Sequence, residues 1–276
     1  MSASIHDLNW CFSTLGCPEL DLTEALDLVA RFGLKRIEIR SLEMRVDMPA
    51  YFTEKWGSAD KIQTQLDQRG ITIASLDTSL HLIGHKPEDR EAFLEFIPWA
   101  EALGVSYLRV FDGGSKDGDL RPGEKAQALD TINWWREKRA GGGWKVDIMM
   151  ETHNAITSTE AIKEIQAALA TPLAILWDSH HTWKVKGEDP SDTFDAIRDW
   201  VPHIHIKDSV PNPEKRGGTQ YLMPGEGDMP LETLLVKLAE DEFEGTVSLE
   251  WERMWHTYME PLADALEHMQ GMGWVG

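Results

Sequence analysis

One pattern recurs through the chain: an amphipathic helix, a glycine, and then a short apolar strand. In its first copy Asp21 and Glu24 form a capping-box sequence, apolar residues follow at helical spacing, and Gly33 precedes the strand. A glycine at this point adopts the left-handed conformation that turns the chain from a helix into the next strand. Gly70 and Gly104 fill the same position in two further copies. A chain built from such units is expected to form an alternating α/β fold.

Eight strands are expected in all, and helices alternate with them. The strands are expected at residues 10–14, 36–40, 71–75, 107–111, 147–150, 173–177, 201–206 and 246–251. Two of the later helices are predicted to begin at Thr157, in a capping box, and after Asp189, which precedes a proline. Eight βα units in 276 residues predict a single (β/α)8 TIM barrel that occupies residues 1–276 as one domain. An open, doubly wound sheet is the rival, but no Gly-x-Gly-x-x-Gly follows the first strand. Residues 209–227 are expected to form an irregular active-site loop.

Composition narrows the class of protein. The net charge of −20 argues against nucleic-acid binding, which requires a basic surface. Cys11 and Cys17 do not form a Cys-x-x-Cys pair, and two cysteines make no disulfide framework. The sequence Met1–Asp7 does not resemble a signal peptide, and no apolar run approaches the ~20 residues that cross a bilayer. A soluble, cytoplasmic protein without a membrane partner is therefore expected.

Four expected strands in the second half end in residues of the types that bind metals. These residues are Glu151, Asp178, His205 and Glu250, and the first three are separated by 27 residues each time. Equal spacing indicates one structural unit that repeats with its chemistry at the same place. Taken singly, each side chain is more often solvated or paired with a cation. Together, three carboxylates and an imidazole in one barrel mouth would repel each other without a cation, which favours a metal site.

Alternation along the strands indicates which neighbours accompany these ligands. His203, His205 and Lys207 share one face of the seventh strand, and Glu151 shares a face with His153. An oxygen-rich ligand set favours a hard divalent ion. We expect one ion, with Mn²⁺ preferred and Mg²⁺, Co²⁺ or Zn²⁺ as alternatives. Such an ion polarises a carbonyl and its neighbouring hydroxyl, while a nearby carboxylate can act as a general base.

These motifs resemble those of a known family. The segments METHN, WDSHH, HIHIKD, GEGD and SLEWE, with FSTLGCPEL near the start, resemble the sugar phosphate isomerase/epimerase family of the xylose isomerase-like barrel superfamily. The resemblance covers essentially the whole chain. It implies that Glu151, Asp178, His205 and Glu250 hold one divalent metal, and that Glu151 and Glu250 exchange a proton with the substrate. It also implies that His181 contacts the substrate or the metal-bound oxygen. A homo-oligomer stays open because family members often form dimers or tetramers.

The chain departs from the ketose 3-epimerases of that family at two positions. Thr157 stands where they carry a glutamate, and Pro211 stands where they carry an arginine. Lys207 follows the seventh strand instead, as in inosose dehydratase-like members. The superfamily's apurinic endonucleases take further metal ligands from the loop after the seventh strand. Here residues 211–225 contain neither Asp nor His, which argues against DNA repair.

The sequence therefore predicts a metal-dependent isomerase or epimerase that acts on a small sugar or keto-polyol through an enediolate. Glu151, Glu250 and His181 are the predicted catalytic residues. The residues expected to contact the substrate are His153, Trp183, His203 and Lys207. A lyase of the same fold, an inosose-type dehydratase or an eliminase of keto-sugars or keto-glycosides, is the alternative because the same enediolate can lose a β-hydroxyl. A non-catalytic sugar-binding barrel is a third option.

Overall fold

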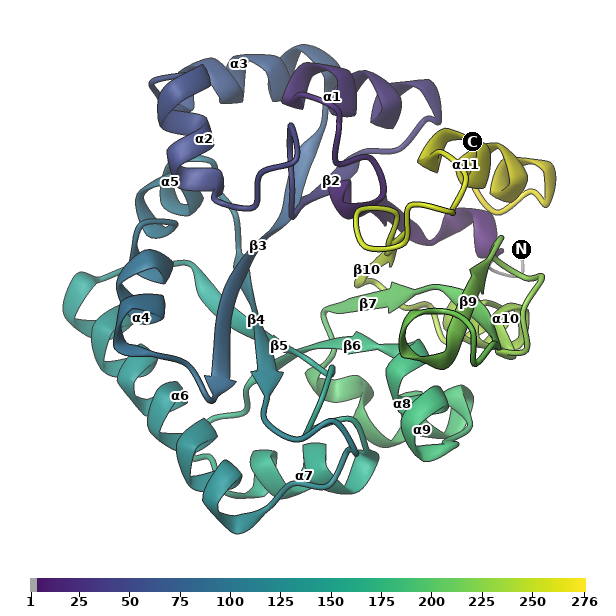
Figure 1. Ribbon diagram of the computed structural model, residues 1–276. Helices are drawn as coiled ribbons and strands as arrows, with labels where there is room; N and C mark the ends of the chain where they lie inside the picture. Colours follow the sequence, from purple (N-terminus) through teal and green to yellow (C-terminus); the bar gives the residue numbers. More distant parts are fainter. Residues whose placement is uncertain (1–3) are drawn as a thin grey trace. The chain divides into compact units, whose positions relative to one another are not determined.

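A computed structural model describes residues 4–276 and divides the chain into two compact units (Figure 1). The terminal unit contains the described residues up to Ala74 together with His203–Gly276, and the central unit is Ser75–Pro202. The first three residues of Met1–Asp7, on which the expected absence of a signal peptide rests, lie outside the described residues. All eight predicted strands are present.

The terminal unit holds the first two and the last of these strands, together with the seventh. Its strands are β1 (Asn9–Phe12), β2 (Arg36–Ile39), β7 (His203–Ile206) and β10 (Thr246–Leu249), and its helices are α1 (Leu22–Arg31), α2 (Met48–Lys55), α3 (Ala59–Arg69), α10 (Leu231–Glu240) and α11 (Leu262–Gly271). Strand β10 pairs in parallel with both β1 and β7, and this register places Ser248 opposite His205. Ile204 and Ile206 are fully buried on the other face of β7, as the alternation predicts.

The central unit holds the other four strands. They are β3 (Thr72–Ile83, which begins just before the unit), β4 (Tyr107–Gly113), β5 (Asp147–Glu151) and β6 (Ala174–Asp178), with helices α4 (Pro87–Leu94), α5 (Ile97–Ala102), α6 (Pro122–Gly142), α7 (Thr159–Ala167), α8 (Ser179–Lys186) and α9 (Pro190–Ile197). These strands are parallel, and α4, α6 and α7 lie on one side of them (Figure 1). The register sets Asp77 beside Arg109 and Phe111 beside Glu151. Polar side chains of three strands are thus brought to neighbouring positions.

The helix boundaries follow from local capping. The predicted box at the start of α1 is confirmed, since Asp21 accepts from the Glu24 N–H and Glu24 accepts from the Asp21 N–H. The helix after Asp189 is also confirmed, because α9 begins at Pro190. The cap predicted at Thr157 is wrong by one residue. Ser158 caps α7, whereas the Thr157 hydroxyl donates to the Asn154 carbonyl.

The stretch expected to be an irregular loop contains a hairpin. Strand β8 (Asp208–Pro211) pairs antiparallel with β9 (Thr219–Leu222), so the prediction of irregular structure for residues 209–227 is wrong in part. Gly217 and Gly218 have positive φ angles in the connection, a conformation that glycine adopts without steric cost. No helix among residues 4–276 is long and apolar enough to cross a membrane.

Candidate metal centre

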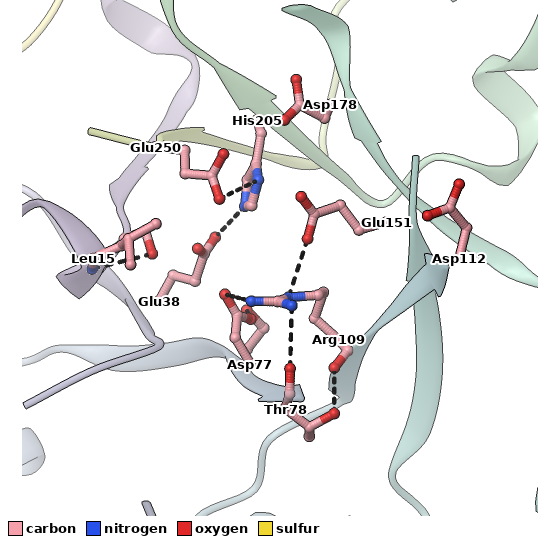
Figure 2. Close-up of polar contacts among 12 residues, drawn as sticks. Leu15, Glu38, Asp77, Thr78, Arg109, Asp112, Glu151, Asp178, His205 and Glu250 are labelled. Carbon is pink, nitrogen blue, oxygen red and sulfur yellow. Dashed lines mark hydrogen bonds and ion pairs between the residues drawn. The ribbon is translucent and has the colours of Figure 1, made fainter. Parts of the chain in front are cut away.

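Two of the predicted ligands, His205 and Glu250, lie together in the terminal unit. His205 is fully buried on β7, and Glu250 directly follows β10. The His205 Nδ1 atom is 3.5 Å from Glu250 Oε1, and its Nε2 atom is 2.9 Å from Oε2 of Glu38 (Figure 2). Each nitrogen of this imidazole therefore faces a carboxylate.

His205 and the two carboxylates shift one another's pKa values toward the charged forms. Burial lowers the pKa of His205, but the carboxylates of Glu38 and Glu250 outweigh that effect and raise it well above its usual value. Burial raises the pKa of Glu38, yet His205 and His203 hold the net value well below its usual range. For Glu250 the opposing cations are Lys207 and His205, and its pKa is likewise held well below the usual value. Both carboxylates are thus kept ionised in the interior.

Lys207 belongs to the same cluster. Its side chain is 1% exposed, and its ammonium is ion-paired with Glu250 and with Glu252, whose Oε1 is 2.7 Å away. The Tyr221 hydroxyl donates to the same oxygen of Glu252 at 3.0 Å. Two carboxylates therefore neutralise Lys207, and its predicted contact with substrate stays a prediction.

Glu151 lies in the central unit at the end of β5, against a buried arginine. Its Oε2 is 3.2 Å from Nε of Arg109, and this guanidinium also lies 3.4 Å from Asp77 Oδ2 and 3.1 Å from the Thr78 carbonyl (Figure 2). The guanidinium also stacks over the ring of Phe111 at 3.9 Å. A rigid cation thus fixes the position of the Glu151 carboxylate.

Asp178 ends β6 and caps the helix that follows. Its Oδ1 accepts from the His181 N–H at 3.0 Å, and its Oδ2 lies 3.1 Å from Nδ1 of the His181 ring. That Nδ1 is also 3.1 Å from the Thr152 carbonyl, which can only accept a hydrogen bond. The ring therefore carries its proton on Nδ1, and Nε2 is left as the basic atom.

The ring of His181 is the first of several aromatic and imidazole rings that pack against one another. The ring of His153 packs edge-on against His181 at 4.7 Å and against Phe111 at 5.0 Å. His81 stacks on Phe111 at 5.0 Å, and burial together with Arg109 lowers the pKa of His81. Nδ1 of His153 faces the Asn154 side-chain oxygen at 3.1 Å, which places the proton on Nδ1 and leaves Nε2 as the acceptor. The two basic Nε2 atoms thus belong to half-buried side chains.

The structure brings the predicted residues together within each unit. Glu151, His153 and His181 each offer one ligand-type atom within a set that spans no more than 4.8 Å, and Asp178, His180 and His181 form a second such set. The ring of Trp183 lies 5.4 Å from that of His180. In the terminal unit His203 joins His205 on Glu38, at 2.8 Å from Oε2.

Reasoning from the sequence missed several buried charged residues, among them Glu38, Asp77 and Arg109. A signal for two of them is visible, because Glu38 interrupts the apolar strand RIEI and Arg109 interrupts YLRVF. A charge in the middle of a buried strand requires a partner. The identity of that partner depends on strand register, which one sequence does not reveal.

The donor atoms of both units fit a divalent cation. Carboxylate oxygens and imidazole nitrogens are the donors that Mn²⁺, Co²⁺ and Zn²⁺ accept. The Glu38–His205 hydrogen bond has the form of the carboxylate–histidine pair found around metal ions, and Nδ1 of the same ring faces Glu250. The four predicted ligands are divided between the units, two in each.

The family model for the xylose isomerase-like TIM barrel matches residues 26–273, so the chain belongs to this family and the predicted (β/α)8 fold is confirmed. Among curated proteins, an inosose dehydratase of Clostridium botulinum is 24% identical over 219 residues, covering 70% of this chain and 73% of that protein. A 3-dehydroshikimate dehydratase of Bacillus anthracis is 31% identical over 103 residues, which is 36% of each protein.

Solved structures agree on the fold. The probable 3-dehydroshikimate dehydratase AsbF of Bacillus anthracis superposes with a TM-score of 0.77 at 18% identity, over 95% of this chain and 98% of that one. The IolI protein with a bound zinc atom gives a TM-score of 0.74 at 20% identity, over 95% of each chain.

Proposed function

We propose that the protein is a metal-dependent lyase that removes water from a small hydroxyketone of the keto-polyol class. Two curated relatives are named as dehydratases, which supports the lyase alternative over an isomerase or epimerase. Lys207 follows the seventh strand as in inosose dehydratase-like members, and Pro211 stands where ketose epimerases carry an arginine, which points the same way. The observation that carries the proposal is the pair of half-buried imidazoles, His153 and His181, packed 4.7 Å apart beside Glu151.

Glu151, Asp178, His205 and Glu250 would hold the cation. In a (β/α)8 barrel the carboxyl ends of the strands converge on one mouth, and each of these residues stands at such an end. The bound zinc of the IolI structure supports a divalent ion in this family, and the preference for Mn²⁺ stays a prediction. When bound, the ion supplies Lewis-acid polarisation of the substrate ketone.

The chain's own residues would then move the proton. Glu151 is ion-paired with Arg109, and Glu250 is ion-paired with Lys207. A carboxylate held by a cation is a weak base, so the geometry favours both as ligands over their predicted acid–base role. The Nε2 atoms of His153 and His181 are the better proton acceptors, because each ring has its Nδ1 proton tied to an oxygen.

The proposed step balances without an oxidant or a second substrate. Nε2 of His181 takes the proton from the carbon α to the ketone, and the ring becomes an imidazolium. The hydroxyl on the β carbon then leaves with that same proton, which yields water and a carbon–carbon double bond conjugated to the carbonyl. The proton taken from carbon is the proton given to the hydroxyl, so the ring returns to its neutral starting state. The Asp178 carboxylate beside His181 would stabilise the transient imidazolium.

The test is an assay of chelator-stripped and Mn²⁺-loaded protein against keto-inositols, dehydroshikimate and ketohexoses in D₂O. We expect metal-dependent loss of one water from a keto-polyol or cyclic hydroxyketone. Deuterium uptake without loss of mass would overturn the lyase assignment in favour of an isomerase or epimerase. No metal-dependent change in any compound would contradict an enzyme for this substrate class.

Single substitutions can separate residues that move the proton from residues that bind the metal. His181→Gln should lose turnover while it retains bound metal, whereas Asp178→Asn should lose both. His6→Gln is the matched control, since His6 is exposed near the start of the described chain and should leave turnover unchanged. A His181→Gln protein with full activity would remove this residue from the proton transfer.

A further inference from the structure

Glu38 is a fully buried carboxylate outside the predicted ligand set. It stands on β2 between Ile37 and Ile39, which are both fully buried. Because neighbouring residues of a strand point to opposite faces, the Glu38 side chain lies on the face opposite to the two isoleucines. Its charge therefore needs polar partners on that face. A buried carboxylate costs several kcal/mol unless it is paired, so its partners indicate why it is there.

Those partners are two imidazoles of β7. Oε2 of Glu38 lies 2.8 Å from His203 Nε2 and 2.9 Å from His205 Nε2. The two rings are 5.5 Å apart and nearly perpendicular, at 79°. The contact of His205 is a hydrogen bond, and because a carboxylate oxygen only accepts, the His205 ring carries a proton on Nε2.

The hydrogen bond to Glu38 also sets the direction of the other ring nitrogen of His205, Nδ1, which faces Glu250. Its Nδ1 lies 3.5 Å from Oε1 of Glu250, the residue predicted to share a metal with it. Figure 2 shows the order Glu38, His205, Glu250, with the imidazole between the two carboxylates. With Nε2–H held by Glu38, Nδ1 is the nitrogen that would ligate a metal, because histidine binds metals through a ring nitrogen that carries no proton.

We infer that Glu38 is a positioning residue for the metal centre, because it locks the orientation and tautomer of His205 so that Nδ1 faces Glu250. This inference rests on the proposed function, since it requires His205 to be a ligand. In this role Glu38 would act through His205 and would not itself be a ligand. His203 gains a role as the second anchor of Glu38, while its contact with substrate stays a prediction.

The first measurement uses the unaltered protein. Long-range ¹H–¹⁵N NMR of the Mg²⁺-loaded or Zn²⁺-loaded protein reports which nitrogen of His205 carries hydrogen, with His205→Gln to assign the signal. We expect a proton on Nε2 and none on Nδ1. A proton on Nδ1 in the loaded protein would overturn the inference without any variant that affects folding.

The second measurement is the affinity for Mn²⁺ alone, read from the electron paramagnetic resonance of the free ion. Loss of such an outer carboxylate typically weakens metal binding about 10–100-fold, and we expect Glu38→Ala to fall in this range. Glu38→Gln keeps an acceptor oxygen and the side-chain volume, so it should fold and show a smaller loss. Glu43→Gln makes the same change of charge at a partly exposed acid that pairs with Lys55, and it should bind Mn²⁺ as the unaltered protein does.

The unfolding free energy of each variant separates positioning from a structural role. A structural residue would lower stability and leave the affinity of the folded protein unchanged, and that result would overturn the inference. Failure of the metal site itself has a different signature, because Asp178→Asn and Glu250→Gln would then also bind Mn²⁺ normally. If those two variants lose Mn²⁺ and Glu38→Ala does not, the inference about Glu38 alone fails.

Discussion

Nε of Arg109 lies 3.2 Å from Oε2 of Glu151, and both side chains are only 1% exposed. The guanidinium reaches a second buried carboxylate, Asp77, at 3.4 Å and a backbone carbonyl at 3.1 Å. Arginine suits this place because its planar fork serves several acceptors at once and keeps its charge when buried. The central unit thus contains its own counter-charge for a predicted metal ligand.

Replacement of Arg109 by Met should destabilise the protein strongly. The change keeps most of the side-chain length but leaves the carboxylates of Asp77 and Glu151 without this cation, which for buried pairs costs about 3–5 kcal/mol. The measurement is the urea midpoint of unfolding. Arg90→Met is the control, since Arg90 pairs with an Asp130 carboxylate that is 74% exposed and should change stability by about 1 kcal/mol or less. Equal losses in the two variants would contradict a special role for the buried pair.

A metal requirement should appear in stability as well as in turnover. A ligand that binds only the folded state stabilises it by about 2.7 kcal/mol when present at 100 times its dissociation constant. Mn²⁺ added to the stripped protein should therefore raise the melting temperature by roughly 5 to 10 °C. Asp178→Asn should lose most of this increase. An unchanged melting temperature over a wide range of Mn²⁺ concentrations would contradict the site.

The turn after β9 should not tolerate a side chain at Gly227. A Cβ atom there would lie 2.1 Å from Oδ1 of Asp208 and 2.6 Å from the Ser209 nitrogen. Asp208 is the anchor of this turn, since its carboxylate accepts from the N–H groups of Gly225, Gly227 and Met229. Such overpacking typically costs 1–3 kcal/mol, and we expect Gly227→Ala to lose about that amount in urea unfolding.

Gly123→Ala is the matched control for that change. Gly123 lies in the first turn of α6, and a Cβ atom there would meet nothing within 4 Å. Alanine in place of a helical glycine is expected to stabilise by about 0.4–1 kcal/mol. If both alanine variants change stability in the same direction, the steric explanation for Gly227 is wrong.

The strands of the barrel could be predicted from the sequence because they are buried, and a buried strand is a short run of apolar residues. All eight were found, and the predicted ligands stand at the ends of β5, β6, β7 and β10 or beside them. The hairpin β8–β9 was missed because its four-residue strands contain Asp208, Pro211 and Gln220 and have no long apolar run. Its stability comes from tertiary anchors instead, such as the Tyr221 hydroxyl on Glu252.

The buried partners could not be predicted for a different reason. Asp77 meets Arg109 because β3 and β4 pair in one register, and a shift by one residue would turn both side chains to other faces. Glu38 meets two histidines that follow it by more than 160 positions in the sequence. The sequence shows which residues of a strand share a face, but it does not show the register in which two strands pair. The sequence therefore identified the strand ends that carry the predicted ligands, whose role in a metal site stays a prediction, but it did not identify the charged residues around them.

Asp112 gives the chain a specific dependence on pH. It is fully buried at the end of β4, and its carboxylate accepts from the N–H groups of Gly113, Asn154 and Ile156. Burial raises its pKa to about 6, and the hydrogen bonds, led by that from Ile156, oppose the rise without cancelling it. In the unfolded chain an aspartate titrates near 3.9. Between these values the folded protein keeps a proton that the unfolded protein has lost, so stability falls as pH rises.

The contribution of Asp112 is therefore complete below about pH 4 and is lost as pH passes through about 6. Because the pI is about 4.8, where a low net charge promotes association, unfolding is best compared from about pH 5 to about pH 7.5. Over this range the unaltered protein should lose about 1 kcal/mol more than Asp112→Asn, which cannot ionise. Asp130→Asn removes an exposed carboxylate from α6 and should follow the unaltered protein. If Asp112→Asn also follows it, the carboxylate is ionised throughout this range, and the N–H groups around it outweigh its burial.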